Sequence, residues 1–288
     1  MYSVFMAQAR KNNDLKIAIW SVVVVVLALA VIIVVKLNAN STTAPINAAT
    51  LAPSSLISKI TSLAGIEFGA IGTGTATKLP QALKNAPALT QNNKPEILYI
   101  GAEYCPYCAT ERWPIVVALS RFGSFSKLGL TTSSSTDVYP STATFAFHGA
   151  TYSSPYISFV GVEQTTNQPD GSGGYTPLDA LTPAEQKLIS TYDASPYVPA
   201  GSAGSIPFID FGGKYLITGS TYDPSVLQGK TADQIAGALS QPGSAIAKGA
   251  LGAANTITAA ICQLTNNQPG NVCNTTVIQG IQAKLGQS

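Results

Sequence analysis

The most uniform stretch of apolar positions lies near the start of the chain. Residues 17–35 carry no charge, and Ser21 is their one polar interruption. A helix of this length spans roughly 28 Å, close to the thickness of the hydrocarbon core of a membrane. Three bases, Arg10, Lys11 and Lys16, precede the run, whereas Lys36 alone follows it directly. The pattern predicts a transmembrane helix over residues 17–37, with residues 1–16 cytoplasmic and the remainder extracytoplasmic. A cleavable signal peptide is the alternative.

The polar segment over residues 38–60 is rich in Ala, Ser, Thr, Asn and Pro, which predicts a linker. Residues 61–288 are expected to form one α/β domain. Its sharpest signals are a buried strand over 96–101, a helix over 109–125 containing Pro114, and a strand–turn–strand over 206–218. Helices are predicted over 223–239, 244–262 and 274–285.

The middle of the chain shows a mixed pattern. Residues 142–148 and 156–163 are typical of strands, and a hairpin between them is one arrangement. Loops are expected over 131–135, over the Gly-rich 167–177 and over 195–204. Thr182, Pro183 and Glu185 have the spacing of a capping box and predict the start of a helix.

Composition excludes several classes of function. Charged residues make up 10% of the chain and the net charge is +2, with no basic cluster, so no nucleic-acid partner is expected. His148 is the single histidine, which argues against a metal site with two histidine ligands. We therefore predict neither metal nor cofactor, and expect His148 to lie at the end of a strand without a catalytic role.

Four cysteines form two close pairs, and the first is Cys105-Pro106-Tyr107-Cys108. The spacing places two sulfurs one helical turn apart, where the start of a helix favours negative charge. We expect Cys105 to be the nucleophile, with a lowered thiol pKa, and Cys108 to resolve the mixed disulfide. Pro106 suits the first helical position, and Tyr107 is expected to be exposed and to tune the motif. A purely structural disulfide or half of a zinc site is the alternative.

The strand over 97–100, the CPYC motif, Pro114 and Ile206-Pro207 before the strand over 208–211 resemble the thioredoxin superfamily. The resemblance implies a thioredoxin-like fold in which Pro207 is cis and faces the Cys105 sulfur. It also implies that the backbone of Ile206 pairs with an extended substrate.

Two features depart from that superfamily. Tyr99 stands where thioredoxins carry a buried aspartate, so Glu103 or Glu111 is a substitute proton acceptor. A strand-containing insertion over about 127–200 separates Cys105 from Pro207.

The whole chain is similar to a family of membrane-anchored archaeal proteins, domain of unknown function 929. The similarity rests on the anchor, the CPYC motif, the segments DVYPSTATFAF and YISFVGVE, and the late cysteine pair. That family supplies no established activity.

The second cysteine pair, Cys262 and Cys273, encloses ten residues with the turn NNQPGN. We expect a structural disulfide that clamps two helices and contributes about 2–3 kcal/mol. A shuttle partner for the first pair and free thiols are the alternatives.

The sequence as a whole predicts a membrane-anchored extracytoplasmic thiol–disulfide oxidoreductase of the oxidase or isomerase type. Its partners would be protein thiol or disulfide clients and a membrane electron-transfer protein. Two alternatives stay open: an extracellular binding or scaffold domain with structural disulfides only, and a disulfide reductase that transfers electrons.

Overall fold

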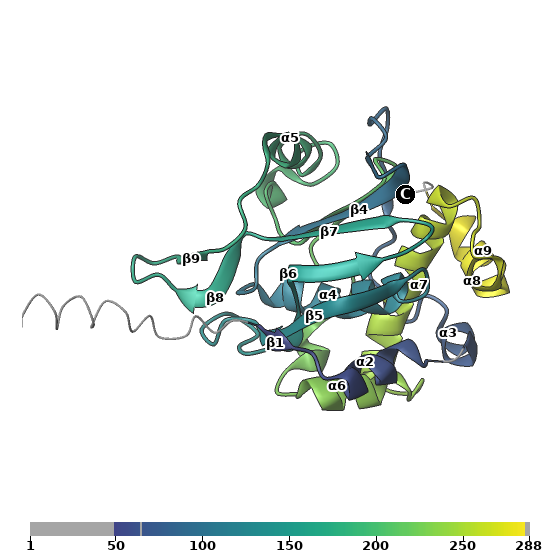
Figure 1. Cartoon of the computed structure of the whole chain (residues 1–288), viewed down its shortest axis with the longest axis horizontal. Helices are drawn as coiled ribbons and strands as arrows, with labels where there is room; N and C mark the ends of the chain where they lie inside the picture. Colours follow the sequence, from purple (N-terminus) through teal and green to yellow (C-terminus); the bar gives the residue numbers. More distant parts are fainter. Residues whose placement is uncertain (1–48, 64, 286–288) are drawn as a thin grey trace, which may run out of the picture. The chain divides into compact units, whose positions relative to one another are not determined.

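The computed structural model describes residues 49–63 and 65–285, which form a mixed α/β structure (Figure 1). The predicted cytoplasmic tail and membrane anchor lie outside these residues. Within the described part, Ala245–Leu264 is long and apolar enough to cross a membrane, but 89% of its apolar window is buried inside the protein. Such burial is typical of the core helix of a soluble domain.

The largest sheet is built around the predicted buried strand, which is confirmed as β4. Its order is β2 (Gln81–Ala82), β11 (Tyr215–Thr218), β10 (Phe208–Phe211), β4 (Lys94–Gly101) and β3 (Thr90–Gln91). β7 (Ser158–Glu163) pairs in parallel with β4, whereas the other pairs of this sheet are antiparallel. The predicted strand–turn–strand is confirmed as β10 and β11, joined by Gly212 and Gly213, which both have positive φ.

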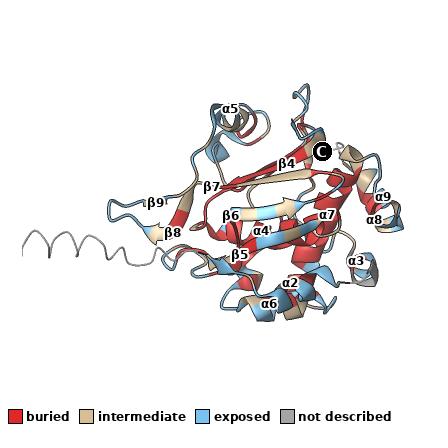
Figure 2. Cartoon of the chain, viewed as in Figure 1, coloured by how far each residue is buried: buried red, intermediate tan, exposed pale blue. Residues whose placement is uncertain are grey.

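Both faces of the sheet are buried. Since successive side chains of a strand point in opposite directions, β4 contributes to a hydrophobic cluster on each face. Ile97 and Tyr99 of β4 join the larger hydrophobic cluster, and Leu98 and Ile100 join the smaller one. The smaller cluster is covered by α5 (Pro183–Tyr192), which begins at the predicted capping box on Thr182. β4 is buried along most of its length (Figure 2).

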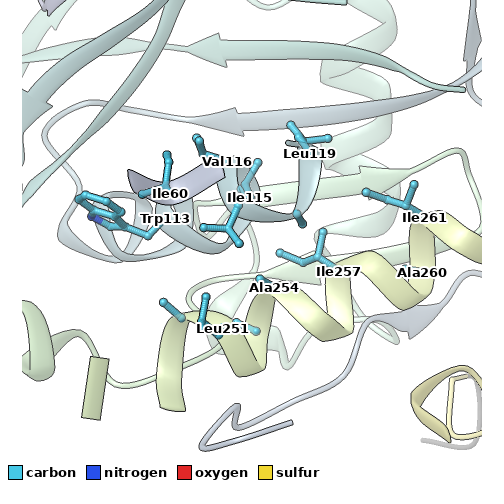
Figure 3. Packing of buried hydrophobic residues seen from close by; sticks show 14 of the residues in the cluster. Ile60, Trp113, Ile115, Val116, Leu119, Leu251, Ala254, Ile257, Ala260 and Ile261 are labelled. Carbon is cyan, nitrogen blue, oxygen red and sulfur yellow. The ribbon is translucent and has the colours of Figure 1, made fainter. Parts of the chain in front are cut away.

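Two packed helices contribute many residues to the larger core. α4 (Pro106–Leu119) packs against α7 (Ala245–Leu264), and 16 of the 20 residues of α7 are buried. Figure 3 shows Ile115 of α4 pointing toward α7, on the side of Leu251 and Ile257. Because α7 is rich in alanine and glycine, the two helices can approach closely.

Pro114 lies inside α4, where it cannot donate the backbone hydrogen bond that a helix requires. The acceptor that loses its partner is the carbonyl of Thr110, four residues earlier. Tyr222 donates its hydroxyl to that oxygen at 3.0 Å, so the buried carbonyl is satisfied from another part of the chain.

A second sheet corrects the predicted secondary structure between α4 and β7. Its order is β1 (Thr50–Leu51), β5 (Ser124–Thr132) and β6 (Ala143–Ser153). The predicted helix over 109–125 therefore begins earlier and ends at Leu119, and β5 was missed. The proposed hairpin over 142–163 is wrong, because β6 pairs with β5 and β7 pairs with β4 in the other sheet. Apolar patterning gives the faces of a strand but not its neighbour.

Two further boundaries differ from expectation. β8 (Thr165–Pro169) and β9 (Tyr175–Pro177) form a small hairpin where a Gly-rich loop was expected. The segment predicted as a linker already belongs to the domain from β1 onward, since α2 (Ser54–Thr61) buries Leu56 and Ile60. α3 (Gly65–Ile71) follows it.

The predicted helix over 223–239 is broken in two. A short 3-10 helix, η2 (Pro224–Leu227), precedes Gly229, whose φ is +68°. A new helix, α6 (Ala232–Leu239), then begins with a capping box between Thr231 and Gln234. The remaining short elements are η1 (Ala200–Ser202), α8 (Gly270–Cys273) and α9 (Thr276–Gln282).

Gly252 of α7 lies where no larger residue fits. A Cβ at this position would lie 2.3 Å from the carbonyl oxygen of Thr73. We expect Gly252→Ala to lower the free energy of unfolding by about 1–3 kcal/mol, because the backbone must move. A Cβ at Gly237 of α6 would meet nothing within 4 Å, so Gly237→Ala should instead stabilise by about 0.5–1 kcal/mol. Chemical denaturation measures both, and an equal effect of the two substitutions would contradict the prediction.

Candidate functional site

The CPYC motif lies at the start of α4, after the short loop that follows β4. Cys105 is the N-cap of α4, and its Sγ accepts the backbone N–H of Cys108 at 3.2 Å. Pro106 occupies the first helical position, as predicted from its missing N–H. Both thiols are free, and Cys105 is 4% exposed whereas Cys108 is fully buried. The sulfur of Cys105 is therefore the one closer to solvent.

The two thiols differ in acidity. The hydrogen bond from the Cys108 side chain lowers the pKa of Cys105, helped by the backbone N–H groups of Cys108 and Tyr107 and by the charge of Arg112, while burial opposes them. Burial is the main reason that the pKa of Cys108 lies well above its ordinary value. A lowered pKa at the first cysteine is what a nucleophile requires, whereas the buried second cysteine keeps its proton until it attacks.

Ile206 and Pro207 reach the cysteines through the register of the sheet. Phe208 of β10 lies opposite Ile100 of β4 in antiparallel pairing, so the residues before β10 lie beside the residues after β4. The carbonyl oxygen of Ile206 lies 3.8 Å from the Cys105 Sγ, and the Ile206–Pro207 peptide is cis. The structure therefore brings together all four residues that the sequence singled out across 102 positions: Cys105, Cys108, Ile206 and Pro207.

Aromatic rings surround the CPYC motif, and two come from the predicted insertion. Tyr107 is 41% exposed and meets the edge of Tyr139 at 6.1 Å between ring centroids. Tyr104 stacks on Tyr175 of β9 at 4.2 Å. The hydroxyl of Tyr175 bonds to Ser134, whose backbone N–H donates to the carbonyl of Tyr104. The insertion thus contacts the loop that carries the cysteines.

The sequence did not predict a buried ion pair that lies close to the cysteine loop. Arg112 of α4 donates to both carboxylate oxygens of Glu163, at 2.8 Å and 2.6 Å, and neither side chain is exposed. The arginine also donates to the carbonyl of Ala102 at 2.8 Å. A signal existed, since Arg112 is a charge one turn after Cys108 in a helix whose other residues are largely apolar.

Of the two glutamates predicted as proton acceptors, Glu103 interacts with both members of the ion pair. Burial, with the nearby charge of Glu163, raises the pKa of Glu103 to about 7. Glu111 instead accepts from the backbone N–H and the hydroxyl of Thr221, and its burial raises its pKa to about 7. Tyr99, at the position of the missing aspartate, is fully buried, and its hydroxyl has no hydrogen-bond partner among the described residues.

His148 lies in β6 rather than at a strand end, and its Nδ1 is 2.8 Å from the carboxylate of Asp179. Among residues 49–63 and 65–285, no group of three or more His, Cys, Asp or Glu side chains could hold a metal ion.

Residues 82–263 match the model of a protein family described as a domain of unknown function, DUF929. The chain belongs to this family. No curated protein and no solved structure matches the chain. The matched region of this DUF929 chain runs from β2 into α7, so it includes the CPYC motif, the ion pair and Pro207.

The disulfide expected near the C-terminus is present in the DUF929 chain. Cys262 of α7 is bonded to Cys273 of α8, and both are fully buried. The bond closes the loop over 263–272, which contains Asn266 and Asn267 with positive φ. It therefore connects the core helix to the two short helices that end the described part.

Removing this disulfide tests its structural role. We expect the double substitution Cys262→Ala and Cys273→Ala to lower the free energy of unfolding by about 2–4 kcal/mol, since the loop is no longer closed in the unfolded state. Alkylation of Cys105 in the folded protein should proceed at an unchanged rate. A lost Cys105 reactivity at intact stability would instead favour a shuttle role for the second pair.

Four buried carboxyls predict that the DUF929 fold is more stable in mild acid than at neutral pH. Burial raises the pKa of Glu103 and Glu111 to about 7, and that of Asp193 and Asp210 to about 6. In the unfolded chain the pKa values of the same groups are about 4. At a pH between the two sets of pKa values, these carboxyls are ionised in the unfolded chain but still protonated in the folded protein. A rise in pH therefore stabilises the unfolded state and lowers the free energy of unfolding.

We therefore expect the free energy of unfolding to be about 1–3 kcal/mol larger at pH 5 than at pH 8, measured by denaturant titration. Asp210→Asn should reduce this difference. Asp170 is the matched control, because its carboxylate accepts from Ser172 and its pKa is lowered, so Asp170→Asn should leave the difference unchanged. Equal stability at the two pH values would contradict the assignment.

Proposed function

We propose that this DUF929 protein catalyses thiol–disulfide exchange with protein clients, using Cys105 and Cys108 on a thioredoxin-like fold. The observation that carries the proposal is the position of one sulfur. The Cys105 Sγ caps the start of α4, accepts a backbone N–H at 3.2 Å and lies 3.8 Å from the carbonyl of Ile206. It thus combines an acidic thiol with a neighbouring backbone group that an incoming chain can pair with.

The order of the central sheet supports a thioredoxin-like fold. β7, β4, β10 and β11 are neighbours in that order, with β7 parallel and β10 antiparallel to β4. α4 follows β4 directly and packs with α7 on one face. This is the arrangement that the resemblance of the CPYC motif and Pro207 implies. The segment over about 127–200, which the sequence predicted to be an insertion, contributes β7 to this arrangement.

The exchange chemistry needs no group beyond the two cysteines and the client. In the isomerase direction, the Cys105 thiolate attacks one sulfur of a client disulfide, forms a mixed disulfide and releases the other client sulfur as a thiolate. That thiolate then attacks another client disulfide or returns to the mixed disulfide. If it does neither, Cys108 loses its proton and attacks Cys105, which releases the client as a dithiol and leaves the Cys105–Cys108 disulfide.

In the oxidase direction the same steps run in reverse, and two electrons and two protons pass from the client dithiol to the Cys105–Cys108 disulfide. A membrane electron-transfer partner of the proposed anchored protein would then accept them. The proposed extracytoplasmic position is supported by the Cys262–Cys273 disulfide, because such bonds persist in oxidising compartments.

One observation favours a second function, a binding or scaffold domain without turnover. Cys105 is 4% exposed, so a client can reach its sulfur only if neighbouring groups move. A trapping experiment separates the two functions.

The test uses the full chain in detergent and a peptide whose single cysteine carries a thionitrobenzoate disulfide. Attack by Cys105 releases the coloured thionitrobenzoate thiolate and joins the peptide to the protein. We expect Cys108→Ser to accumulate this adduct, because no second thiol resolves it, and Cys105→Ser to form none. The wild type should release the peptide again as Cys108 closes the disulfide.

An adduct absent from Cys108→Ser, with both variants folded by circular dichroism, would exclude thiol exchange and favour the binding domain. Adduct formation at equal rates in both single variants would remove Cys105 from its role as nucleophile.

A further inference from the structure

We propose that Arg112, held by Glu163, is a positioning residue that stabilises the thiolate forms of the cysteine pair and thereby makes the Cys105–Cys108 disulfide more oxidising. The inference rests on the proposed thiol–disulfide exchange and adds to it the charge that controls its direction. Arg112 touches neither client nor reacting sulfur in this role; it acts through its fixed charge.

The ion pair is fixed from three sides. Arg112 comes from α4, Glu163 is the last residue of β7, and the carbonyl of Ala102 follows β4. Gly101 and Glu163 are the last partners in the parallel pairing of β4 with β7. The guanidinium therefore lies where two strands end and the loop to Cys105 begins.

Cys108 and Arg112 are four residues apart in α4, so they occupy the same face of the helix. Both are fully buried, and little water can screen their interaction. The charge of Arg112 lowers the pKa of both cysteines, and the charge of Glu163 raises the pKa of Cys108. The two members of the ion pair thus act on the buried thiol with opposite sign.

The ion pair leaves one donor unused. Nη1 of Arg112 is buried and has no hydrogen-bond partner among the described residues. An unsatisfied buried donor costs about 1–3 kcal/mol, and a buried ion pair is seldom more stable than apolar side chains of the same size. Stability alone therefore explains this arrangement poorly, whereas an anion that forms nearby only in the reduced protein gives the buried positive charge a role.

The other groups around the pair do not supply this charge. The ring of Tyr99 lies 5.7 Å from the Arg112 guanidinium, and its phenol stays neutral because burial raises its pKa well above the ordinary value. Glu103 also interacts with both Arg112 and Glu163, but its carboxyl can only add negative charge. Within the described part of the chain, Arg112 is the cation that lowers the pKa of Cys108.

A fixed cation changes the redox equilibrium because the thiolate exists only in the reduced protein. Stabilising the reduced form raises the reduction potential, and tenfold in the equilibrium constant corresponds to about 30 mV for this two-electron couple. The missing buried aspartate at position 99 has the same consequence, since a carboxylate there would oppose the thiolate.

The test measures the equilibrium of the full-length protein with glutathione and the pH profile of Cys105 alkylation by iodoacetamide. In Arg112→Gln with Glu163→Gln, both charges are gone and a hydrogen bond between the two amides remains possible. We expect the disulfide to become about tenfold harder to reduce, and the alkylation midpoint to move to higher pH. Unchanged values in the folded double variant would overturn the proposal.

A single substitution gives the opposite sign and covers the case in which the double variant does not fold. Glu163→Gln keeps the cation and removes the anion, so the disulfide should become easier to reduce and the midpoint should move to lower pH. An effect of packing alone would not reverse between the two variants. No shift in Glu163→Gln would also overturn the proposal.

Arg121 provides the matched control. It is a largely buried arginine that contacts Asn255, Thr258 and the ring of Phe68 instead of the cysteine loop. Arg121→Gln should lose stability yet leave both readouts unchanged, and a shift equal to that of the double variant would overturn the assignment to Arg112.

Neither the glutathione equilibrium nor the alkylation profile needs a client. A failed peptide trap with shifted potentials would therefore remove the proposed function, whereas a successful trap with unshifted potentials would remove only the role of Arg112.

Discussion

The antiparallel pairing of β10 with β4 is the constraint on which the site depends. It sets Phe208 opposite Ile100, and so it brings the residue before Pro207 to the sulfur that follows β4. If this register slipped by one residue, every inward side chain of β10 would turn to the other face of the sheet. Burial of both faces of the sheet therefore fixes the register of β10 with β4, and this register places Ile206 next to Cys105.

The chain has few charged side chains, and some of them are buried, where their electrostatic interactions are stronger. Arg112 and Glu163 lie without solvent contact at the ends of β4 and β7. In so low a dielectric, the field of a guanidinium acts on nearby thiols far more strongly than it would at the surface. The glutamate keeps the arginine in place and opposes its effect on the pKa of Cys108, to which burial makes the larger contribution.

The insertion gives the cysteine loop surroundings that a minimal core would lack. Tyr175 from the β8–β9 hairpin stacks on Tyr104, and Tyr139 meets Tyr107. These contacts join the predicted insertion to the segment that carries Cys105 and Cys108.

The sequence by itself determined the elements whose signals are local. The CPYC motif placed Cys105 at a helix start, the capping box placed the start of α5, and the Gly212-Gly213 turn fixed β10 and β11, because each depends on a few neighbouring residues. It also indicated that Pro207 and Cys105 would meet, but only through resemblance to other proteins. Tertiary structure alone decided that β7 pairs with β4 instead of β6, and that residues 50–61 belong to the domain. It alone placed Glu163 against Arg112, 51 positions away. Hydrogen-bond partners between strands and charge partners in a core are choices among many equivalent residues, and only the packing of the whole chain selects one.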